Sequence, residues 1–250
     1  MSFMICIPAR YASSRLPGKA LLKIGGKTII RRVYEQCKRS EAAEIVVATD
    51  DARIVSEVES FGGQACLSKK SVSTGSDRVA ATLKELAVLP NTIVVNVQGD
   101  EPAMSPAVIN QVAKAVVDQR DSVCTVCEPL ESMQAADSSI VKVVRDSSNR
   151  ALYFSRSSIP WYDIESRMTT LGSGLLRRHV GIYGYTAMVL ENFIATEPAS
   201  IELAERLEQL RFLYNGTSVF VFDAVEPCGV GVDTEEDYQK ICELLESGEF

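Results

Sequence analysis

The chain has 250 residues, a formal net charge of −7 and a sequence pI near 5.0. This length is enough for one large α/β domain with a full core. The acidic balance argues against nucleic acid as a partner, because phosphate backbones select basic surfaces. No apolar run approaches the roughly 20 residues of a membrane span, and the N-terminus lacks a signal-peptide pattern. We therefore expect a cytoplasmic protein without a membrane partner.

The seven cysteines are an odd and scattered set. The one close pair, Cys124 and Cys127, lies in an apolar run typical of a strand. Residues three apart in a strand point to opposite faces, so these two thiols are expected to diverge. Because the chain also has a single histidine, we expect reduced cysteines and no zinc or redox site.

The first strand and the loop after it carry the main ligand signal. The apolar run Phe3–Ile7 predicts a buried strand that ends at Pro8, and the loop then supplies Arg10, Arg15 and Lys19. Open α/β sheets bind ligands at the carboxyl ends of their strands, and these cations suit a triphosphate. A solvated basic loop is the alternative from composition alone. The loop matches neither the Walker A pattern nor the G-x-G-x-x-G fingerprint.

Strand and helix patterns then alternate along the chain. Strands are expected at 44–49, 64–67, 92–97 and 122–127, and helices at 29–39, 52–61, 74–89 and 106–119. This alternation predicts a parallel sheet covered on both faces. Further strands are expected at 141–145, 151–155, 179–185 and 218–223, with helices at 187–195, 201–214 and 234–246. The region 128–185 reads as an inserted block that forms a lid or an oligomer surface.

Two carboxylates stand where a metal would be useful. Asp100 follows the strand at 92–97, on one side of the expected ligand crevice. A carboxylate beside a phosphate-binding loop indicates Mg²⁺, which binds through one or two carboxylates plus phosphate oxygens. Asp233 precedes the last helix, where the alternative is a simple N-terminal cap.

Other polar residues have weaker individual signals. Thr74–Arg78 begins a helix whose N–H groups suit a polar ligand, although an ordinary capped turn has the same residues. Gln98 directly follows a buried strand and so lies at the expected crevice. His179 is by itself more often a core histidine, and Glu208 and Gln209 on an amphipathic helix are more often solvated.

Eight segments together resemble one family. They read PARYxSxRLPGKxL from Pro8, VATDD at 47–51, TGSDR at 74–78, NVQGDEP at 96–102, ALYFSRxxIPW at 151–161, RHVGIYGY at 178–185, LEQLR at 207–211 and GVDTEED at 231–237. In order and over nearly the whole chain, they resemble the 3-deoxy-manno-octulosonate cytidylyltransferases, or CMP-Kdo synthetases. Sugar nucleotidyltransferases share the opening loop more broadly, whereas the IYGY and LEQLR segments are narrower.

The resemblance implies a Rossmann-like α/β fold: a mostly parallel sheet with helices on both faces and an inserted β-rich subdomain for dimerisation and the sugar side. Residues 1–250 would form one domain, with a nucleotide-binding half at 1–127 and a half at 128–250 that supplies the sugar site, the dimer contacts and the second metal ligand. The implied reaction transfers CMP from CTP to the acid sugar Kdo, releases pyrophosphate, uses Mg²⁺ and serves lipopolysaccharide biosynthesis in a homodimer.

The resemblance also implies a role for each matching residue. The CTP phosphates would be held by Arg10, Arg15 and Lys19, of which Lys19 would also be catalytic. The base, ribose and sugar would lie near Thr74, Gly75, Arg78 and Gln98. Mg²⁺ would be held for catalysis by Asp100 and Asp233, and the sugar acid would be contacted by Gln98, His179, Tyr185, Glu208 and Gln209. The anomeric hydroxyl would attack the α-phosphorus in line, so catalysis would rest on positioning and charge neutralisation.

Three departures leave the sugar open. Val72 stands where the family usually has histidine, Ala20 replaces a proline, and Thr186 replaces an arginine. An 8-amino variant of Kdo or another 2-keto acid sugar is therefore an alternative substrate, although sialic acid enzymes match only the first loop. A non-catalytic nucleotide-binding homologue is disfavoured because both carboxylates are present, and a dinucleotide oxidoreductase because its glycine fingerprint is absent.

Overall fold

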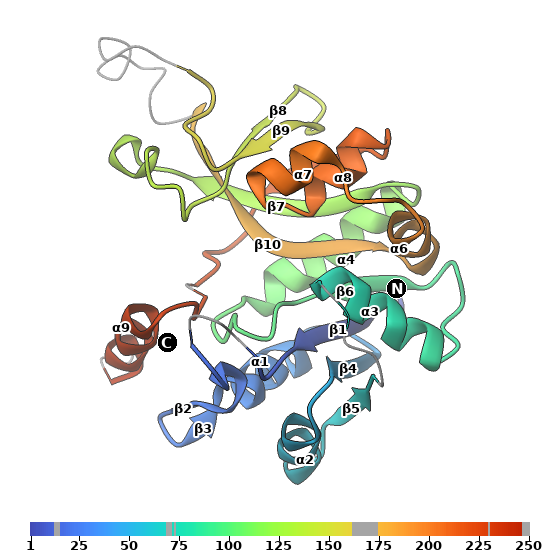
Figure 1. Ribbon diagram of the computed structural model, residues 1–250, viewed down its shortest axis with the longest axis vertical. Helices are drawn as coiled ribbons and strands as arrows, with labels where there is room; N and C mark the ends of the chain where they lie inside the picture. The colour runs from blue at the N-terminus through green and yellow to red at the C-terminus, as the bar shows by residue number, and fades with distance from the viewer. Residues whose placement is uncertain (13–15, 69–71, 73, 162–174, 230, 247–250) are drawn as a thin grey trace.

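A computed structural model describes residues 1–12, 16–68, 72, 74–161, 175–229 and 231–246. Within them a nine-stranded sheet has the order β11-β7-β10-β6-β1-β4-β5, with the β8–β9 hairpin attached to β10 (Figure 1). The strands are β1 (Met4–Ala9), β2 (Lys23–Ile24), β3 (Lys27–Thr28), β4 (Glu44–Thr49), β5 (Gln64–Leu67), β6 (Ile93–Asn96), β7 (Val123–Pro129), β8 (Lys142–Arg145), β9 (Ala151–Ser155), β10 (Arg177–Thr186) and β11 (Val219–Asp223).

Helices cover both faces of this sheet, as the alternation predicts. The α-helices are α1 (Ile29–Lys38), α2 (Ala52–Ser60), α3 (Gly75–Glu85), α4 (Pro106–Asp118), α6 (Ala187–Ile194), α7 (Ser200–Glu205), α8 (Gln209–Tyr214) and α9 (Glu235–Glu246), and the short 3-10 helices are η1 (Lys19–Leu21) and η2 (Ser132–Gln134). One apolar cluster packs α1, α2 and α4 on one face, and a second packs α3, α6 and α8 on the other.

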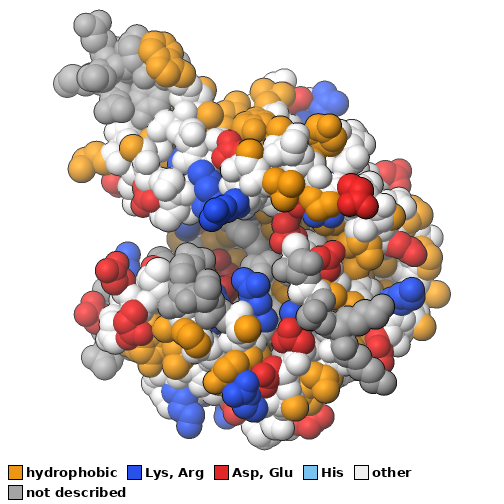
Figure 2. Space-filling model, viewed as in Figure 1, with side chains coloured by type: hydrophobic (Ala, Val, Ile, Leu, Met, Phe, Trp, Pro, Cys, Tyr) orange, Lys and Arg blue, Asp and Glu red, His pale blue; other side chains and the backbone are white. Residues whose placement is uncertain are grey.

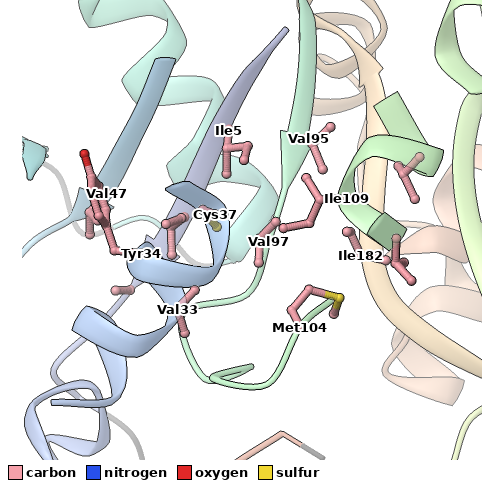
Figure 3. Packing of buried hydrophobic residues seen from close by; sticks show 14 of the residues in the cluster. Ile5, Val33, Tyr34, Cys37, Val47, Val95, Val97, Met104, Ile109 and Ile182 are labelled. Atoms are coloured by element: carbon pink, nitrogen blue, oxygen red, sulfur yellow. The ribbon is translucent and has the colours of Figure 1, made fainter. Parts of the chain in front are cut away.

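The central strand β1 shows why the sequence folds this way. All six of its residues are buried, and it pairs in parallel with β4 on one side and β6 on the other. Ile5 and Ile7 belong to the first apolar cluster, whereas Met4 and Cys6 belong to the second. A strand covered on both faces needs such a continuous apolar run. Figure 3 shows Ile5 among side chains of the first cluster.

The expected end of the first strand at Pro8 is wrong. The strand continues to Ala9, and Pro8 pairs with Ala48 of β4. The carbonyl of Pro8 accepts from the Gly99 N–H. Because the nitrogen and the carbonyl of one strand residue point to the same neighbour, the Pro8 nitrogen also faces the β6 side, where β6 has already ended at Asn96. No ladder bond is lost there, because a proline without a donor is tolerated where the neighbouring strand is absent.

The sheet is parallel apart from β10 and the hairpin beside it. β10 runs antiparallel between β6 and β7, which the sequence pattern did not predict. Through β10, strand β7 is joined to β6 and so to the remaining strands of the sheet. The β8–β9 hairpin pairs with β10, so this part of the block at 128–185 is continuous with the central sheet.

The single helix expected at 201–214 is also wrong, because the structure has two. α7 ends at Glu205, and Arg206 adopts the left-handed conformation with φ 56°. The break allows α8 to fold back, so that the buried Arg211 donates from Nε to the Glu202 carboxylate at 2.7 Å. Local helix propensity is uniform across the segment, and this buried charge pair outweighs it.

Among the described residues, every helix is too short or too polar to cross a membrane.

Thr82 provides a test of the packing of α3. Its side chain is fully buried, and its hydroxyl has no hydrogen-bond partner among the described residues. An unpaired buried hydroxyl costs free energy, so Thr82→Val is expected to stabilise the fold by about 1 kcal/mol. Urea unfolding should show a higher midpoint with an unchanged slope.

Thr28→Val is the matched control. Its hydroxyl accepts from the Arg31 N–H as the cap of α1 and donates to Glu57. This variant should lose stability by about 1 kcal/mol or more. A lower midpoint for Thr82→Val would contradict the interpretation of Thr82 as an unpaired group.

Candidate active site

A cavity of about 590 Å³ opens at the carboxyl ends of β1 and β6. The space-filling view shows the molecule hollowed between its upper and lower parts, with charged side chains near the opening (Figure 2). The sequence placed the ligand crevice at this edge of the sheet. The wall combines both halves of the chain, from Pro8 to Asp233.

The loop after β1 and the loop after β6 approach each other closely at the cavity. A Cβ on Gly99 would lie 2.8 Å from the carbonyl oxygen of Pro8, which is too short for any other residue type. Arg10 and Lys19 line the cavity from the first loop, and Asp100 lines it from the second. Arg15 lies outside the described residues, so its phosphate contact stays a prediction.

Lys19 joins three distant parts of the chain. Its ammonium donates to the Asp100 carboxylate, to Oδ1 of Asp233 at 3.0 Å and to the carbonyl of Val232 at 3.1 Å. Burial by itself lowers the pKa of Lys19, but the two carboxylates outweigh burial and raise the pKa above its ordinary value. The ammonium is therefore a fixed positive charge.

The two carboxylates fit a divalent cation, because their oxygens already converge on one cationic atom. Within the described residues, no group of three or more His, Cys, Asp and Glu side chains forms a complete metal site. Mg²⁺ does not need one where nucleotide phosphates supply the other ligands. Burial and then the Asp100 charge raise the pKa of the neighbouring Glu101 to about 8.

Asp233 reaches the site through a structured turn. The carboxylate of Asp237 accepts from the backbone N–H groups of Asp233 and Thr234, at 3.0 and 2.9 Å. Thr234 caps α9 by accepting from the Asp237 N–H. Asp233 itself is not the capping residue, and its side chain turns to Lys19 instead.

Arg78 is the most deeply buried cation of the cavity wall. Thr74 caps α3 by accepting from the Asp77 N–H, which fixes the first turn of the helix. Nη2 of Arg78 donates to Asp50 at 2.8 Å. Nη1 is buried and has no hydrogen-bond partner among the described residues. Thr74, Gly75 and Gln98 line the same wall, as the sequence predicted.

The remaining predicted residues meet at the other end of the cavity. His179 and Tyr185 come from β10, and Glu208 and Gln209 from the start of α8. The break at Arg206 is what turns Glu208 and Gln209 toward the cavity rather than along a solvated helix face. Burial lowers the pKa of His179 to about 3, so its imidazole is neutral.

Three further cations in the wall were missed as site residues. They are Arg156, Arg178 and Arg206. Arg178 pairs with Glu128 and donates to the carbonyl of Cys228 at 2.9 Å. Arg156 and Arg178 lie inside the family-like segments at 151–161 and 178–185, and this position could have indicated them as site residues. Their charge makes the cavity suitable for an anionic ligand.

Comparison with known proteins decides the family. A family model described as cytidylyltransferase matches residues 4–220. The chain belongs to the cytidylyltransferase family. Two relatives named 3-deoxy-manno-octulosonate cytidylyltransferase match over the full length. That of Cellvibrio japonicus is 44% identical over 100% of both chains, and that of Idiomarina loihiensis is 43% identical over 99% of this chain and 100% of the relative.

Solved structures agree with this cytidylyltransferase assignment. A CMP:2-keto-3-deoxy-manno-octonic acid synthetase in complex with CTP superposes with a TM-score of 0.89, at 38% identity and over 99% of both chains. A Bacillus anthracis protein described as a putative glucose-1-phosphate thymidylyltransferase has a TM-score of 0.67 at 15% identity, covering 98% of this chain and 95% of its own. This second likeness shows the fold alone. Together they confirm the predicted Rossmann-like α/β class.

The charge state of His179 is directly testable, because it is the one histidine of the chain. We expect its imidazole to stay neutral between pH 8 and pH 5, since burial lowers its pKa to about 3 from an ordinary value near 6.5. A side-chain NMR titration of the folded enzyme measures this. A midpoint between pH 6 and 7 would contradict it.

The same shift has a consequence for stability. The unfolded chain binds a proton at this histidine below about pH 6.5, whereas the folded chain does not. The free energy of unfolding should therefore fall as the pH drops from 6.5 toward 3, and His179→Gln should remove that part of the fall.

Proposed function

We propose that this cytidylyltransferase transfers CMP from CTP to the anomeric hydroxyl of Kdo, or of a close relative of Kdo, and releases pyrophosphate. The observation that carries the proposal is the convergence of Lys19, Asp100 and Asp233 in the wall of a cavity that further arginines also line. The names of full-length relatives and of the CTP-bound neighbour support the same substrates.

The nucleotide would lie along the β1 side of the cavity. Arg10 and Lys19 would contact the phosphates, together with Arg15. Arg78 is buried, and its Nη1 has no partner within the described part of the chain, which suits an acceptor on the base or ribose. Thr74 and Gly75 place the start of α3 next to it, so backbone N–H groups would face the nucleotide as well.

Asp100 and Asp233 would hold Mg²⁺, which when bound supplies charge stabilisation at the α-phosphate and acidifies the attacking hydroxyl. Lys19 already offsets part of the charge of these two carboxylates and holds them near each other. Near the phosphates, the same ammonium would stabilise the charge that develops on the departing pyrophosphate.

The sugar would lie between β10 and α8. Gln98, His179, Tyr185, Glu208 and Gln209 would orient it. Of the three family departures, Ala20 alone lies in the described cavity wall. Thr186 caps α6 by accepting from the Val189 N–H, so its change from arginine serves local structure.

Pyrophosphate release tests the proposal. The purified protein with CTP and Mg²⁺ should release pyrophosphate when Kdo or 8-amino-Kdo is added, and the faster of the two identifies the preferred sugar. Asp100→Asn should lower the rate by about 10²-fold or more, because it removes a charge from the metal-binding pair.

Asp121→Asn is the matched control, since Asp121 is exposed and lies outside the cavity wall. Its rate should stay within twofold of the unchanged protein. Tight CTP binding without release for either sugar would contradict the proposed reaction and favour a nucleotide-binding homologue.

We also propose a homodimer formed through residues 128–185, in the cytoplasm where CTP is available. Large apolar side chains are exposed in this block, with Leu152 61% and Trp161 84% accessible. These side chains could be buried against a partner chain. In each chain of this dimer, residues 1–127 and 128–250 would form one domain.

Leu152→Glu tests the dimer. Leu152 lies on β9 with its side chain outward, so a charge there should not disturb the core but should oppose burial against a partner. Light scattering should give the mass of a dimer for the unchanged protein and of a monomer for the variant. Leu203→Glu, at an equally exposed leucine on α7, should remain dimeric.

A further inference from the structure

The pairing of β10 with β7 is interrupted beside the cavity. Val180 pairs with Val126, and the next pair is Gly184 with Cys124. Three residues of β10, 181–183, therefore face one residue of β7, Thr125. Such a bulge breaks the ladder locally and redirects nearby side chains, which is why bulges often lie next to active sites.

Thr125 fills this interruption with its hydroxyl. The side chain is fully buried, and Oγ1 lies 2.7 Å from the carbonyl oxygen of Ile182 and 3.2 Å from that of Val180. It also lies 3.1 Å from Nε2 of His179. One buried hydroxyl thus links two carbonyls of the bulge to the imidazole.

The proton count of this group fixes the histidine tautomer. A hydroxyl has one proton to donate, and carbonyl oxygens can only accept. The short contact to Ile182 uses the Thr125 proton. For the contact with His179 to be a hydrogen bond, Nε2 must then carry the proton and donate to Oγ1. If Thr125 instead donated its proton to Nε2, the buried carbonyls of Ile182 and Val180 would face only the lone pairs of Oγ1 and would receive no hydrogen bond from it.

A neutral imidazole protonated at Nε2 has a bare Nδ1, which only accepts. His179 lines the cavity and its Nε2 contacts the buried Thr125 hydroxyl, so we assign the cavity side of the ring to Nδ1. Phe154 packs edge-on against the ring at 5.0 Å, and Tyr183 lies against it at 5.4 Å. These ring contacts hinder rotation of the imidazole, so they hold its orientation while the hydrogen bond with Thr125 holds its tautomer.

We propose that Thr125 is a positioning residue that holds His179 in the Nε2–H tautomer, so that Nδ1 accepts a hydrogen bond from a hydroxyl group of the sugar. The sugar contact rests on the proposed function; the tautomer does not. In this arrangement the site selects a ligand with a hydroxyl donor at that position over one with an acceptor there.

The first measurement uses the full chain without substrates, labelled with ¹⁵N-histidine. Because the chain has one histidine, one pair of ring nitrogens is observed. We expect a protonated Nε2 and an unprotonated, pyridine-type Nδ1 at pH 7. A protonated Nδ1, or two averaged nitrogens, would overturn the proposal.

The second measurement compares three variants. Thr125→Val removes the hydroxyl with little change in shape, and the two nitrogen signals should move toward averaged values. Its KM for the sugar should rise about three- to tenfold, the loss expected for one hydrogen bond, while its KM for CTP stays within twofold. Thr125→Ser keeps the hydroxyl and should restore both the tautomer and the sugar KM.

Thr82→Val is the control, because it makes the same atomic change at a buried threonine whose hydroxyl has no partner among the described residues. It should leave the histidine signals and both KM values unchanged. If Thr125→Val leaves the nitrogen signals unchanged, or raises the two KM values equally, Thr125 is a purely structural residue and the proposal fails.

The two proposals fail in different ways. Absence of pyrophosphate release with either sugar would overturn the proposed function and the sugar contact with it. The nitrogen spectra of the unchanged protein and of Thr125→Val would still decide whether Thr125 sets the tautomer.

Discussion

The structure depends on one partly buried cluster of charge: the Lys19 ammonium between Asp100 and Asp233. Its three members are more than 200 residues apart at the extremes, and each follows a different element. The ammonium uses all three of its protons, on two carboxylates and on the carbonyl of Val232. Two carboxylates that share one partner repel each other, and a cation between them offsets that repulsion. Lys19 supplies this charge and joins the last part of the chain to the first.

The antiparallel strand β10 gives the cavity its second wall. It lies between β6, which ends beside Gln98, and β7, which carries Thr125. Through this position His179 and Tyr185 face the cavity to which the β1 loop contributes its cations. The broken helix completes the enclosure, because the buried pair of Glu202 and Arg211 folds α8 back over the sheet. The cavity wall therefore combines the ends of parallel strands with one antiparallel strand and one short helix.

Much of the fold was predictable because its determinants are local. Four buried strands and the helices between them have apolar periodicity that matches the observed bounds to within a few residues, and β4 and β5 match at both ends. The errors occur where a distant partner decides. The extension of β1 through Pro8 depends on where β6 ends, and the split at Arg206 depends on a charge pair closed from nine residues away. Local propensity indicates neither which strands become neighbours nor which charged side chains meet.

The sequence by itself determined the family, the cationic loop after the first strand and the two candidate metal carboxylates, because these are fixed residue types at fixed positions along the chain. Only the tertiary structure decided which groups touch. It placed Lys19 on the carboxylates, left a buried nitrogen of Arg78 without a partner among the described residues, and brought Arg156, Arg178 and Arg206 into the wall. It also set Thr125 against His179 across a bulge, which no spacing along the chain encodes. The physical reason is that hydrogen bonds and charge pairs act over a few ångströms in space, whatever the separation in sequence.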